Sequence, residues 1–391
     1  AAIALSEVGE YFRLNIEAGG SAAARLDKLR TQTSEEIIQL FESSHLLVFT
    51  TQGEWFAANR TLTKDEPVNY VSVSRNGVQR GVPVVEIEGR VYYVSGNERE
   101  TGDAAQGQAV YSSAYDDVST RYVSEPESLL AGHLIQDVDG GALQAKVRRN
   151  AAARWWLKDR NGRLICALVI RNQEIMAFVE WVPADGGRVL ALSVDGQNQV
   201  WLTIERRGTV THEVMEESEL NLFQGAVRGQ TDLAGRFSGQ SGSLSIWEGR
   251  DVYARADGVI HGPLRVRAGK IDLAGPATDV VAGLWQPPVF ESLPYFRLLP
   301  NEEVLMRPAR LHSVTVNVIE TESIAIGANG SAPQDVPLQP GTILHDRAPP
   351  PVTGPVRRSG LLGWTYGTTL TISQMRPGRL QVRDYVPEIT F

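Results

Sequence analysis

Two pairs of adjacent carboxylates are the residues of this sequence best suited to chemistry. They are Asp116–Asp117 and Glu216–Glu217. Glycosidic bond hydrolysis needs two carboxylates that face each other across a cleft. Neighbours along a strand point to opposite faces of a sheet, so adjacency in sequence neither provides nor excludes this geometry. The second pair belongs to an acidic stretch, residues 213–219, whose composition favours a solvated loop or the wall of a channel.

Three further motifs each lack a residue that their chemistry requires. Residues 212–216, HEVME, begin like a zinc-binding H-E-x-x-H helix, but Glu216 stands where the second histidine is needed. Residues 137–140, DVDG, resemble the start of a calcium loop whose twelfth position would be Arg148 in place of a glutamate. Residues 262–270 end in Gly-Lys like a phosphate loop, but their glycines are spaced too far apart and Ile271 replaces the required Ser or Thr.

The histidines complete this search. None of them has a partner at metal-binding spacing, and a structural or surface role is expected for His45, His133, His212, His261, His312 and His345. We therefore predict no catalytic residue, no cofactor-binding residue, no metal site and no cofactor, and the sequence predicts a protein that is not an enzyme.

The net charge and the single cysteine indicate which partners the protein can bind and in which redox compartment it assembles. The formal net charge is −8, and no basic stripe is evident that would grip a nucleic acid backbone. This balance argues against DNA binding but not against the passage of DNA through a conduit. Cys166 is the only cysteine, which excludes an intrachain disulfide and favours assembly in a reducing cytoplasm. It lies in the apolar run 164–170 and is expected to be a small buried hydrophobe.

The tryptophans indicate core packing and one possible interface. Trp155, Trp156, Trp181 and Trp201 recur among predicted strands, where a role in the core is expected. Trp285 is followed closely by two prolines and could anchor a subunit interface.

Short apolar or alternating runs between turn residues predict an all-β fold. Strands are expected at residues 46–50, 84–87 and 90–94, and later at 264–266, 313–318 and 370–372. The clearest pattern covers residues 154–206, where Asn-Gly and Asp-Gly turns separate runs at 164–170, 175–181, 189–194 and 200–204. We interpret it as one antiparallel meander of four or five strands, the size of one blade of a β-propeller.

Helices are expected to be few and short. Residues 34–41 have Ser34 as a possible N-cap followed by acids, and residues 124–134 form a second candidate. After residue 207 short strands alternate with Gly and Pro, which favours a small sandwich or barrel. The predicted fold class is therefore all-β, with propeller-like meanders in residues 1–207 and a second β-sandwich or barrel region in residues 208–391.

Several segments, taken in order, resemble the nozzle proteins of short bacteriophage tails, also called tail tubular or stabilization proteins. They are residues 44–55 (SHLLVFTTQGEW), 81–94 (GVPVVEIEGRVYYV), 114–117 (AYDD), 127–134 (ESLLAGHL), the Trp-rich meander, 370–374 (LTISQ) and 386–388 (VPE). The resemblance covers most of the chain as ordered patterns, without a single diagnostic motif.

This resemblance implies a structural virion protein. A nozzle or tail-tip ring of identical subunits, six by analogy, would surround a channel for DNA ejection, and DNA would pass without specific binding. The expected partners are further copies of the chain, the adaptor or portal-side ring above, and tail fibre or needle proteins below. The expected location is the phage tail, assembled in the host cytoplasm. No apolar run reaches the roughly 20 residues of a membrane span, and no signal peptide is readable.

Two other functions remain open at this stage. A propeller could bind glycans or degrade polysaccharide in the tail, with Asp116, Asp117, Glu216, Glu217 and Trp285 as candidates for its groove. A non-viral propeller scaffold that binds a protein partner is the third hypothesis.

Overall fold

The structure is a computed structural model of the 391-residue chain. It describes residues 1–29, 34–96, 108–145, 152–216, 222–298, 304–305, 307–338, 350–361 and 363–391. The chain divides into two compact units, Ala1–Met215 and Glu216–Phe391. The division that we predicted from the sequence lies between residues 207 and 208, whereas the last strand of the first unit continues to Val214.

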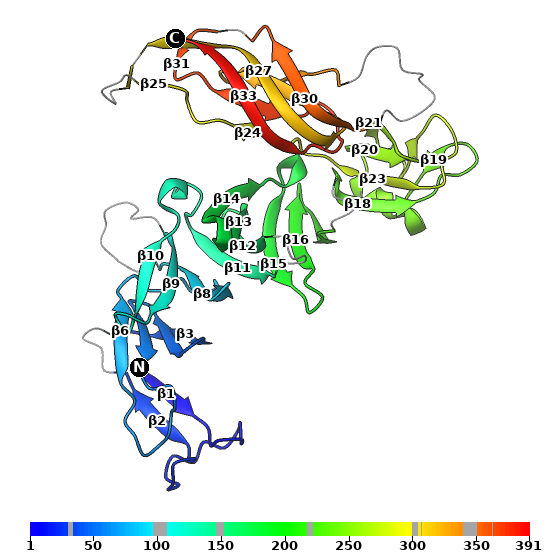
Figure 1. Cartoon of the computed structure of the whole chain (residues 1–391). Helices are drawn as coiled ribbons and strands as arrows, with labels where there is room; N and C mark the ends of the chain where they lie inside the picture. Colours follow the sequence, from blue (N-terminus) through cyan, green and yellow to red (C-terminus); the bar gives the residue numbers. More distant parts are fainter. Residues whose placement is uncertain are drawn as a thin grey trace. The chain divides into compact units, whose positions relative to one another are not determined.

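After an N-terminal hairpin, the first unit contains four antiparallel sheets of three or four strands that follow one another in chain order (Figure 1). The first sheet comprises β3 (Ile37–Glu42), β4 (Leu46–Thr50), β5 (Glu54–Ala57) and β6 (Tyr70–Ser74). The second comprises β7 (Val85–Ile87), β8 (Arg90–Val94), β9 (Val110–Asp116) and β10 (Arg121–Pro126). The third comprises β11 (Val138–Gln144), β12 (Ala153–Asp159), β13 (Leu164–Ile170) and β14 (Ile175–Trp181). The fourth comprises β15 (Arg188–Val194), β16 (Val200–Arg206) and β17 (Thr209–Val214).

Neighbouring sheets of this unit pack face to face because alternate residues of a strand serve opposite faces. In β12, Trp155 packs against the second sheet, whereas Trp156 packs against the fourth. In β8, Tyr93 contacts the first sheet and Tyr92 contacts the third. A strand that is apolar at successive positions therefore supplies two cores at once. This stacking of sheets is the propeller-like arrangement that the sequence predicts.

A two-stranded hairpin covers the far face of the first sheet. It is formed by β1 (Ala2–Leu5) and β2 (Arg25–Lys28), and Ile3 packs on Val48 of β4. Its long connection, residues 6–24, is named the N-terminal loop below.

The second unit begins with a four-stranded sheet in the order β18-β23-β20-β21. These strands are β18 (Gln224–Gly229), β20 (Asp251–Ala256), β21 (Val259–Arg265) and β23 (Val280–Leu284). A small sheet of β19 (Arg236–Phe237) and β22 (Ile271–Asp272) and the 3-10 helix η5 (Gln240–Trp247) accompany it. Trp247 is fully buried, and its indole N–H donates to the carbonyl of Gly225 at 2.9 Å.

The remainder of the second unit is a β-sandwich. One sheet comprises β24 (Phe290–Glu291), β28 (Ala325–Ala328), β29 (Gln334–Asp335) and β32 (Leu370–Ser373). The other is built on β27 (Pro308–Thr321), which pairs with β30 (Val352–Ser359), β31 (Thr365–Tyr366) and β33 (Val382–Thr390). A separate pair joins β25 (Arg297–Leu298) to β26 (Val304–Leu305). Val314 and Val316 of β27 face Ile326 of β28 and Leu370 of β32 across the sandwich core.

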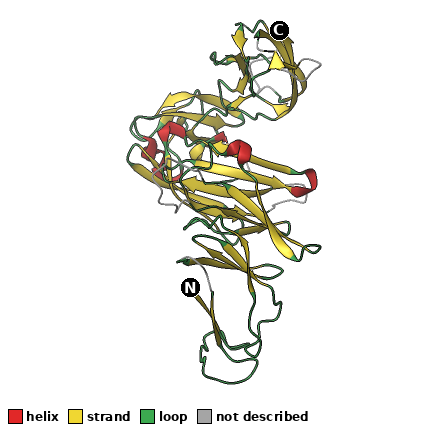
Figure 2. Cartoon of the chain, turned by 90° about the vertical axis from the view of Figure 1, so that its left-hand side faces the viewer, coloured by secondary structure: helices red, strands yellow, loops and turns green. Residues whose placement is uncertain are grey.

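The predicted fold class is confirmed: the protein is all-β, with propeller-like sheets and a second β-sandwich region. Helical structure in the described residues is limited to short 3-10 turns (Figure 2), which include η5, η1 (Leu129–Ala131), η2 (Arg171–Gln173) and η3 (Ala184–Gly186). No helix of the described residues is long and apolar enough to cross a membrane.

Three details of the prediction are wrong. Residues 34–41 do not form a helix, because residues from Ile37 onward pair with β4 as the edge strand β3. Residues 124–134 contain the end of β10 and the single turn η1. The meander at 154–206 is not one sheet, because the η3 turn carries the chain from β14 to a new sheet that packs against the other face of β12.

Candidate functional site

The carboxylate pairs do not form a catalytic arrangement in the described residues. Asp116 ends β9, and its carboxylate accepts the backbone N–H groups of Val118 (3.1 Å) and Ser119 (3.2 Å). These hydrogen bonds, with that from the Ser119 side chain the largest effect, lower the pKa of Asp116. A glycosidase acid needs a raised pKa, so this environment suits a turn and not an acid catalyst. Asp117 and Glu216 are exposed, and Glu217 lies outside the described residues.

The other chemical candidates fall into structural positions. No group of three or more His, Cys, Asp or Glu that could hold a metal ion occurs in the described part of the chain. His45 is buried against the rings of Phe56 and Tyr122, and burial, followed by the charge of Arg60, lowers its pKa. Cys166 is buried, and burial raises the pKa of its thiol to about 11, so that the thiolate is disfavoured at neutral pH.

The prediction of core packing is confirmed for three of the four strand tryptophans. Trp155 and Trp156 are buried in the core, and the half-buried Trp181 packs against the same core cluster as Trp156. Trp201 was expected in the core but is 42% exposed, because it lies on the outer face of the fourth sheet, where its indole N–H donates to Asp195 at 2.8 Å. Trp285 packs edge-to-face on Tyr253 with ring centroids 5.3 Å apart, and its predicted role at an interface stays a prediction.

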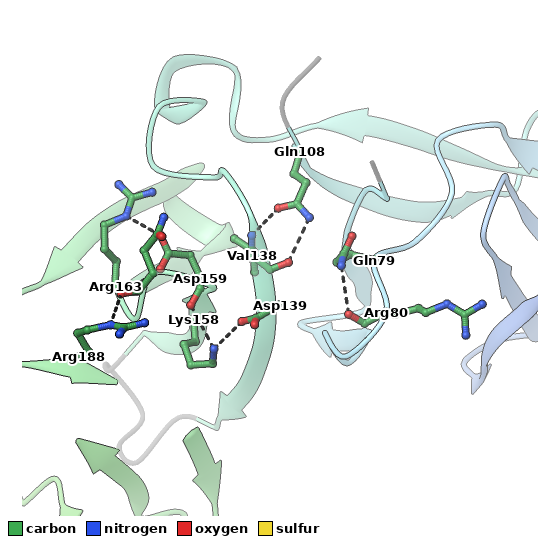
Figure 3. Close-up of polar contacts among 10 residues, drawn as sticks. Gln79, Arg80, Gln108, Val138, Asp139, Lys158, Asp159, Arg163 and Arg188 are labelled. Carbon is green, nitrogen blue, oxygen red and sulfur yellow. Dashed lines mark hydrogen bonds and ion pairs between the residues drawn. The ribbon is translucent and has the colours of Figure 1, made fainter. Parts of the chain in front are cut away.

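Polar side chains gather where the turns of the third and fourth sheets meet (Figure 3). The ammonium of Lys158 donates to Asp139 at 2.6 Å. The Asp159 carboxylate is fully buried and accepts from both the backbone N–H (2.8 Å) and the guanidinium Nε (2.6 Å) of Arg163. Arg188 donates to the carbonyl of Asn161 at 3.1 Å. Both carboxylates are neutralised by neighbouring cations, so the cluster fixes turns and leaves no uncompensated acid.

A glutamine joins the second and third sheets beside this cluster. The side-chain amide of Gln108 donates to the carbonyl of Val138 at 3.1 Å and accepts its N–H at 2.6 Å (Figure 3). Because Val138 begins β11, the glutamine completes hydrogen bonding at a strand end that has no further strand partner there.

Among the buried charged residues that sequence reasoning missed, two lie in contacts between the sheets of the first unit. Glu54 of β5 lies between the first and second sheets, with 2% of its surface exposed. Arg206 of β16 lies between the third and fourth sheets and is fully buried. It forms an ion pair with Glu213 and donates to the carbonyl of Ala184 at 3.2 Å. Both residues belong to strands with apolar residues at alternate positions, but nothing local distinguishes them from exposed charged residues.

The N-terminal loop exposes a group of large apolar side chains. Its most exposed members are Tyr11 (86%) and Phe12 (98%), and the group also includes Val8, Leu14 and Ile16. The loop is held in place, because Lys64 donates to the carbonyls of Ile16 (2.6 Å) and Ala18. Scattered apolar residues are normal on a protein surface, whereas five within nine positions make this loop a candidate interaction surface.

A second apolar surface lies on the outer face of the fourth sheet. Trp201 of β16 is opposite Val214 of β17, and both side chains are more than 40% exposed. Leu190 and Val210 are exposed to a similar degree. The inner residues of the same strands, such as Leu202 and Ile204, are buried against the third sheet. The fourth sheet thus carries apolar residues on both faces, although only one face is packed within the described residues of the first unit.

Comparisons with known proteins find similar solved structures but no matching family model or curated protein. Among solved structures, a glycoside hydrolase family 43 arabinoxylan arabinofuranohydrolase from Bacillus subtilis, in complex with cellotetraose, is similar at a TM-score of 0.23 and 9% identity. That match covers 88% of this chain and 75% of the other. A bifunctional GH43-CE protein of Bacteroides eggerthii matches at a TM-score of 0.24 and 10% identity, over 90% of this chain and 53% of the other.

These matches correct one prediction. The chain was expected not to be an enzyme, but both solved structures reported above are glycoside hydrolases, and that expectation is withdrawn. Their descriptions agree better with the alternative of a glycan-directed protein than with a phage tail ring. TM-scores this low carry no argument for a particular activity of this chain.

Proposed function

We propose that this chain is a structural subunit of a bacteriophage tail, in a nozzle or tail-tip ring through which DNA passes. The observation that carries the proposal is the pair of different apolar surfaces on the first unit, the N-terminal loop and the outer face of the fourth sheet. A ring of identical subunits needs two unlike surfaces that fit each other head to tail. One such surface alone would produce only a two-fold dimer.

The stacked sheets and the charge also support this proposal. A channel wall must be rigid, and each contact between neighbouring sheets of the first unit has a continuous apolar core. The net charge of −8 suits a conduit that does not grip DNA. In the proposed ring, about six copies would meet an adaptor or portal-side ring on one side and fibre or needle proteins on the other, within the virion.

Negative-stain electron microscopy and light scattering on the purified chain test this function. We expect closed rings with a central hole and a molar mass that is a multiple of the 42.8 kDa chain. A strictly monomeric chain over the concentration range of the experiment, with no ring after addition of the neighbouring tail proteins, would contradict the proposal. Weak binding to double-stranded DNA at physiological salt is expected from the purified rings.

A second candidate, a glycan-binding or polysaccharide-degrading tail protein, is favoured by one observation in the second unit. Trp364 and Tyr366 are 57% and 66% exposed, and residues two apart along an extended segment share a face. Exposed aromatic faces of this kind can stack on sugar rings. Polysaccharide binding that is lost in Trp364→Ala and Tyr366→Ala, with the chain monomeric, would favour this candidate over the ring.

A further inference from the structure

Glu54 is a carboxylic acid in the contact between the first and second sheets. It begins β5 and lies on the same strand face as Phe56, which packs against Val91 and Tyr93 of the second sheet. Only 2% of its surface is exposed, so neither carboxyl oxygen has ready access to bulk water.

A short series of hydrogen bonds leads from Glu54 into the second sheet. The hydroxyl of Ser74, on β6, donates to Glu54 Oε2. The backbone N–H of Asn76 donates to the Ser74 hydroxyl at 3.3 Å, and the Asn76 side chain donates to the Tyr93 hydroxyl at 3.2 Å. Tyr93 in turn shares a 2.6 Å hydrogen bond with Ser124 on β10. This series of hydrogen bonds starts at the buried carboxyl group and connects β5 and β6 of the first sheet with β8 and β10 of the second.

The carboxyl group has no charged partner in the described residues. The Oε1 atom of Glu54 has no hydrogen-bond partner in the described part of the chain. The backbone N–H groups of Asn76, Gly77 and Glu54 itself act on the carboxyl group in the direction that lowers its pKa. The titratable side chain that faces it is Tyr93, whose pKa is raised first by burial and then by the charge of Glu54. Burial of this carboxyl group without a cation outweighs the hydrogen bonds that it accepts, so the neutral acid is favoured.

We propose that Glu54 is a proton-dependent latch, which keeps its proton while the first two sheets are closed on each other and loosens their contact when the proton is lost. In the closed state the neutral carboxyl and Ser74 share one hydrogen bond without a buried charge. In the ionised state the same site holds a negative charge, and the least costly response is for the sheets to separate enough to admit water. The proton is released to solvent, and no other group is required.

The direction of the pH effect follows from the shift of this group. Burial, the largest cause, raises the pKa of Glu54 from 4.5 to about 7, against smaller opposing effects from hydrogen bonds led by that of Ser74. The closed state therefore binds the proton more tightly than the open state does. The stabilisation is complete below about pH 4.5 and is lost as the pH rises through about 7.

Hydrogen exchange measured by mass spectrometry on the full chain tests the latch. We compare peptides that cover β5, β6, β8 and β10 at pH 6 and pH 8.5, after correction for the intrinsic pH dependence of exchange. Opening of these strands should increase on the order of 10-fold or more at the higher pH. Glu54→Gln, which cannot ionise, should abolish the increase, whereas Glu86→Gln at an exposed position of β7 should retain it.

Two results would overturn the latch. One is an equal pH response in wild type and Glu54→Gln, and the other is no response in the wild type. If Glu54→Gln does not fold, the carboxyl carbon of Glu54 can be followed by NMR in the isotopically labelled wild-type chain. A titration midpoint near 7 supports the latch, and a midpoint near 4.5 contradicts it.

Discussion

The contact between the third and fourth sheets and the contact between the first and second sheets each bury an ionisable side chain. Only the former provides a side chain of opposite charge. Between the third and fourth sheets, Arg206 is fully buried and paired with Glu213. Between the first and second sheets, Glu54 is buried beside the Ser74 hydroxyl and backbone N–H groups, and no ion pair of the described residues involves it. The two contacts have the same architecture, so the difference lies in the residues that the neighbouring strand contributes.

This comparison shows that burial alone does not decide the charge state of a group. A guanidinium cannot release its proton in a protein, so Arg206 must be given a partner. A carboxyl can become neutral, so Glu54 can be buried without one. The fourth sheet therefore buries a permanent ion pair between its own strands β16 and β17, whereas we propose that the contact of the first two sheets depends on a proton.

Removing the partner of Arg206 is expected to have the largest effect. Glu213→Ala removes the carboxylate that forms an ion pair with the buried Arg206 guanidinium and should lower the stability of the fourth sheet by about 3 kcal/mol. Protection of β15–β17 amides against hydrogen exchange measures this loss. Glu180→Ala, at an exposed position of β14, is the control. An effect no larger than that of the control would mean that the other partners of Arg206, which include the Ala184 carbonyl and the Thr211 hydroxyl, compensate for the lost carboxylate.

The change in stability with pH at the contact between the first and second sheets should be nearly as large as the effect of Glu213→Ala. With the pKa of Glu54 near 7 in the folded state and 4.5 as its ordinary value, the contact loses up to about 3 kcal/mol as the pH rises from below 4.5 to above 7. Urea midpoints of the wild type and Glu54→Gln at pH 5 and pH 8 measure the difference. Ser74→Ala removes a hydrogen bond that lowers the pKa of Glu54. In this variant the loss of stability should therefore extend to higher pH. A loss of stability that ends at lower pH in this variant than in the wild type would contradict the conclusion that Glu54 is the titrating group.

Removing the Tyr93 hydroxyl from the contact between the first and second sheets should lower stability by a smaller amount. Tyr93→Phe leaves the Asn76 amide and the Ser124 hydroxyl without their buried partner, at a cost of about 1–2 kcal/mol. Tyr111→Phe is the matched control, because the ring of Tyr111 stacks on that of Tyr93 with centroids 5.7 Å apart. Both variants keep the stacked rings, so equal urea midpoints for the two would show that the Tyr93 hydroxyl does not join the sheets.

The smallest effect on stability is expected at the N-terminal loop. Phe12→Ser replaces a side chain that is 98% exposed and should change the unfolding free energy by less than about 0.5 kcal/mol. In the proposed ring, however, it removes an apolar contact between subunits, so light scattering should show loss of assembly. Leu130→Ser, at a position that is equally exposed on η1, should leave assembly unchanged. Rings of normal size in Phe12→Ser would exclude the loop from the subunit contact.

Local patterns in the sequence were sufficient for many of the strands. The runs predicted at residues 164–170 and 175–181 have the bounds of β13 and β14, because β-branched and aromatic residues between turn residues favour extended structure wherever the chain is placed. The all-β fold class and the burial of Cys166 follow from the same patterns. None of these depends on which strands become neighbours in space.

Tertiary structure decided where those strands pack and which polar groups they bury. A turn between two strands of one sheet and a turn that starts a new sheet use similar residues, so the single meander expected at 154–206 became parts of two sheets. The helix predicted at residues 34–41 does not form, because residues from Ile37 onward pair with β4. Backbone hydrogen bonds between the strands and a shared core outweigh the helix propensity of these residues. Glu54, Arg206 and Trp201 all occupy strands of similar composition. Whether each faces a neighbouring sheet or solvent depends on contacts with distant segments, and these contacts are what sequence periodicity does not specify.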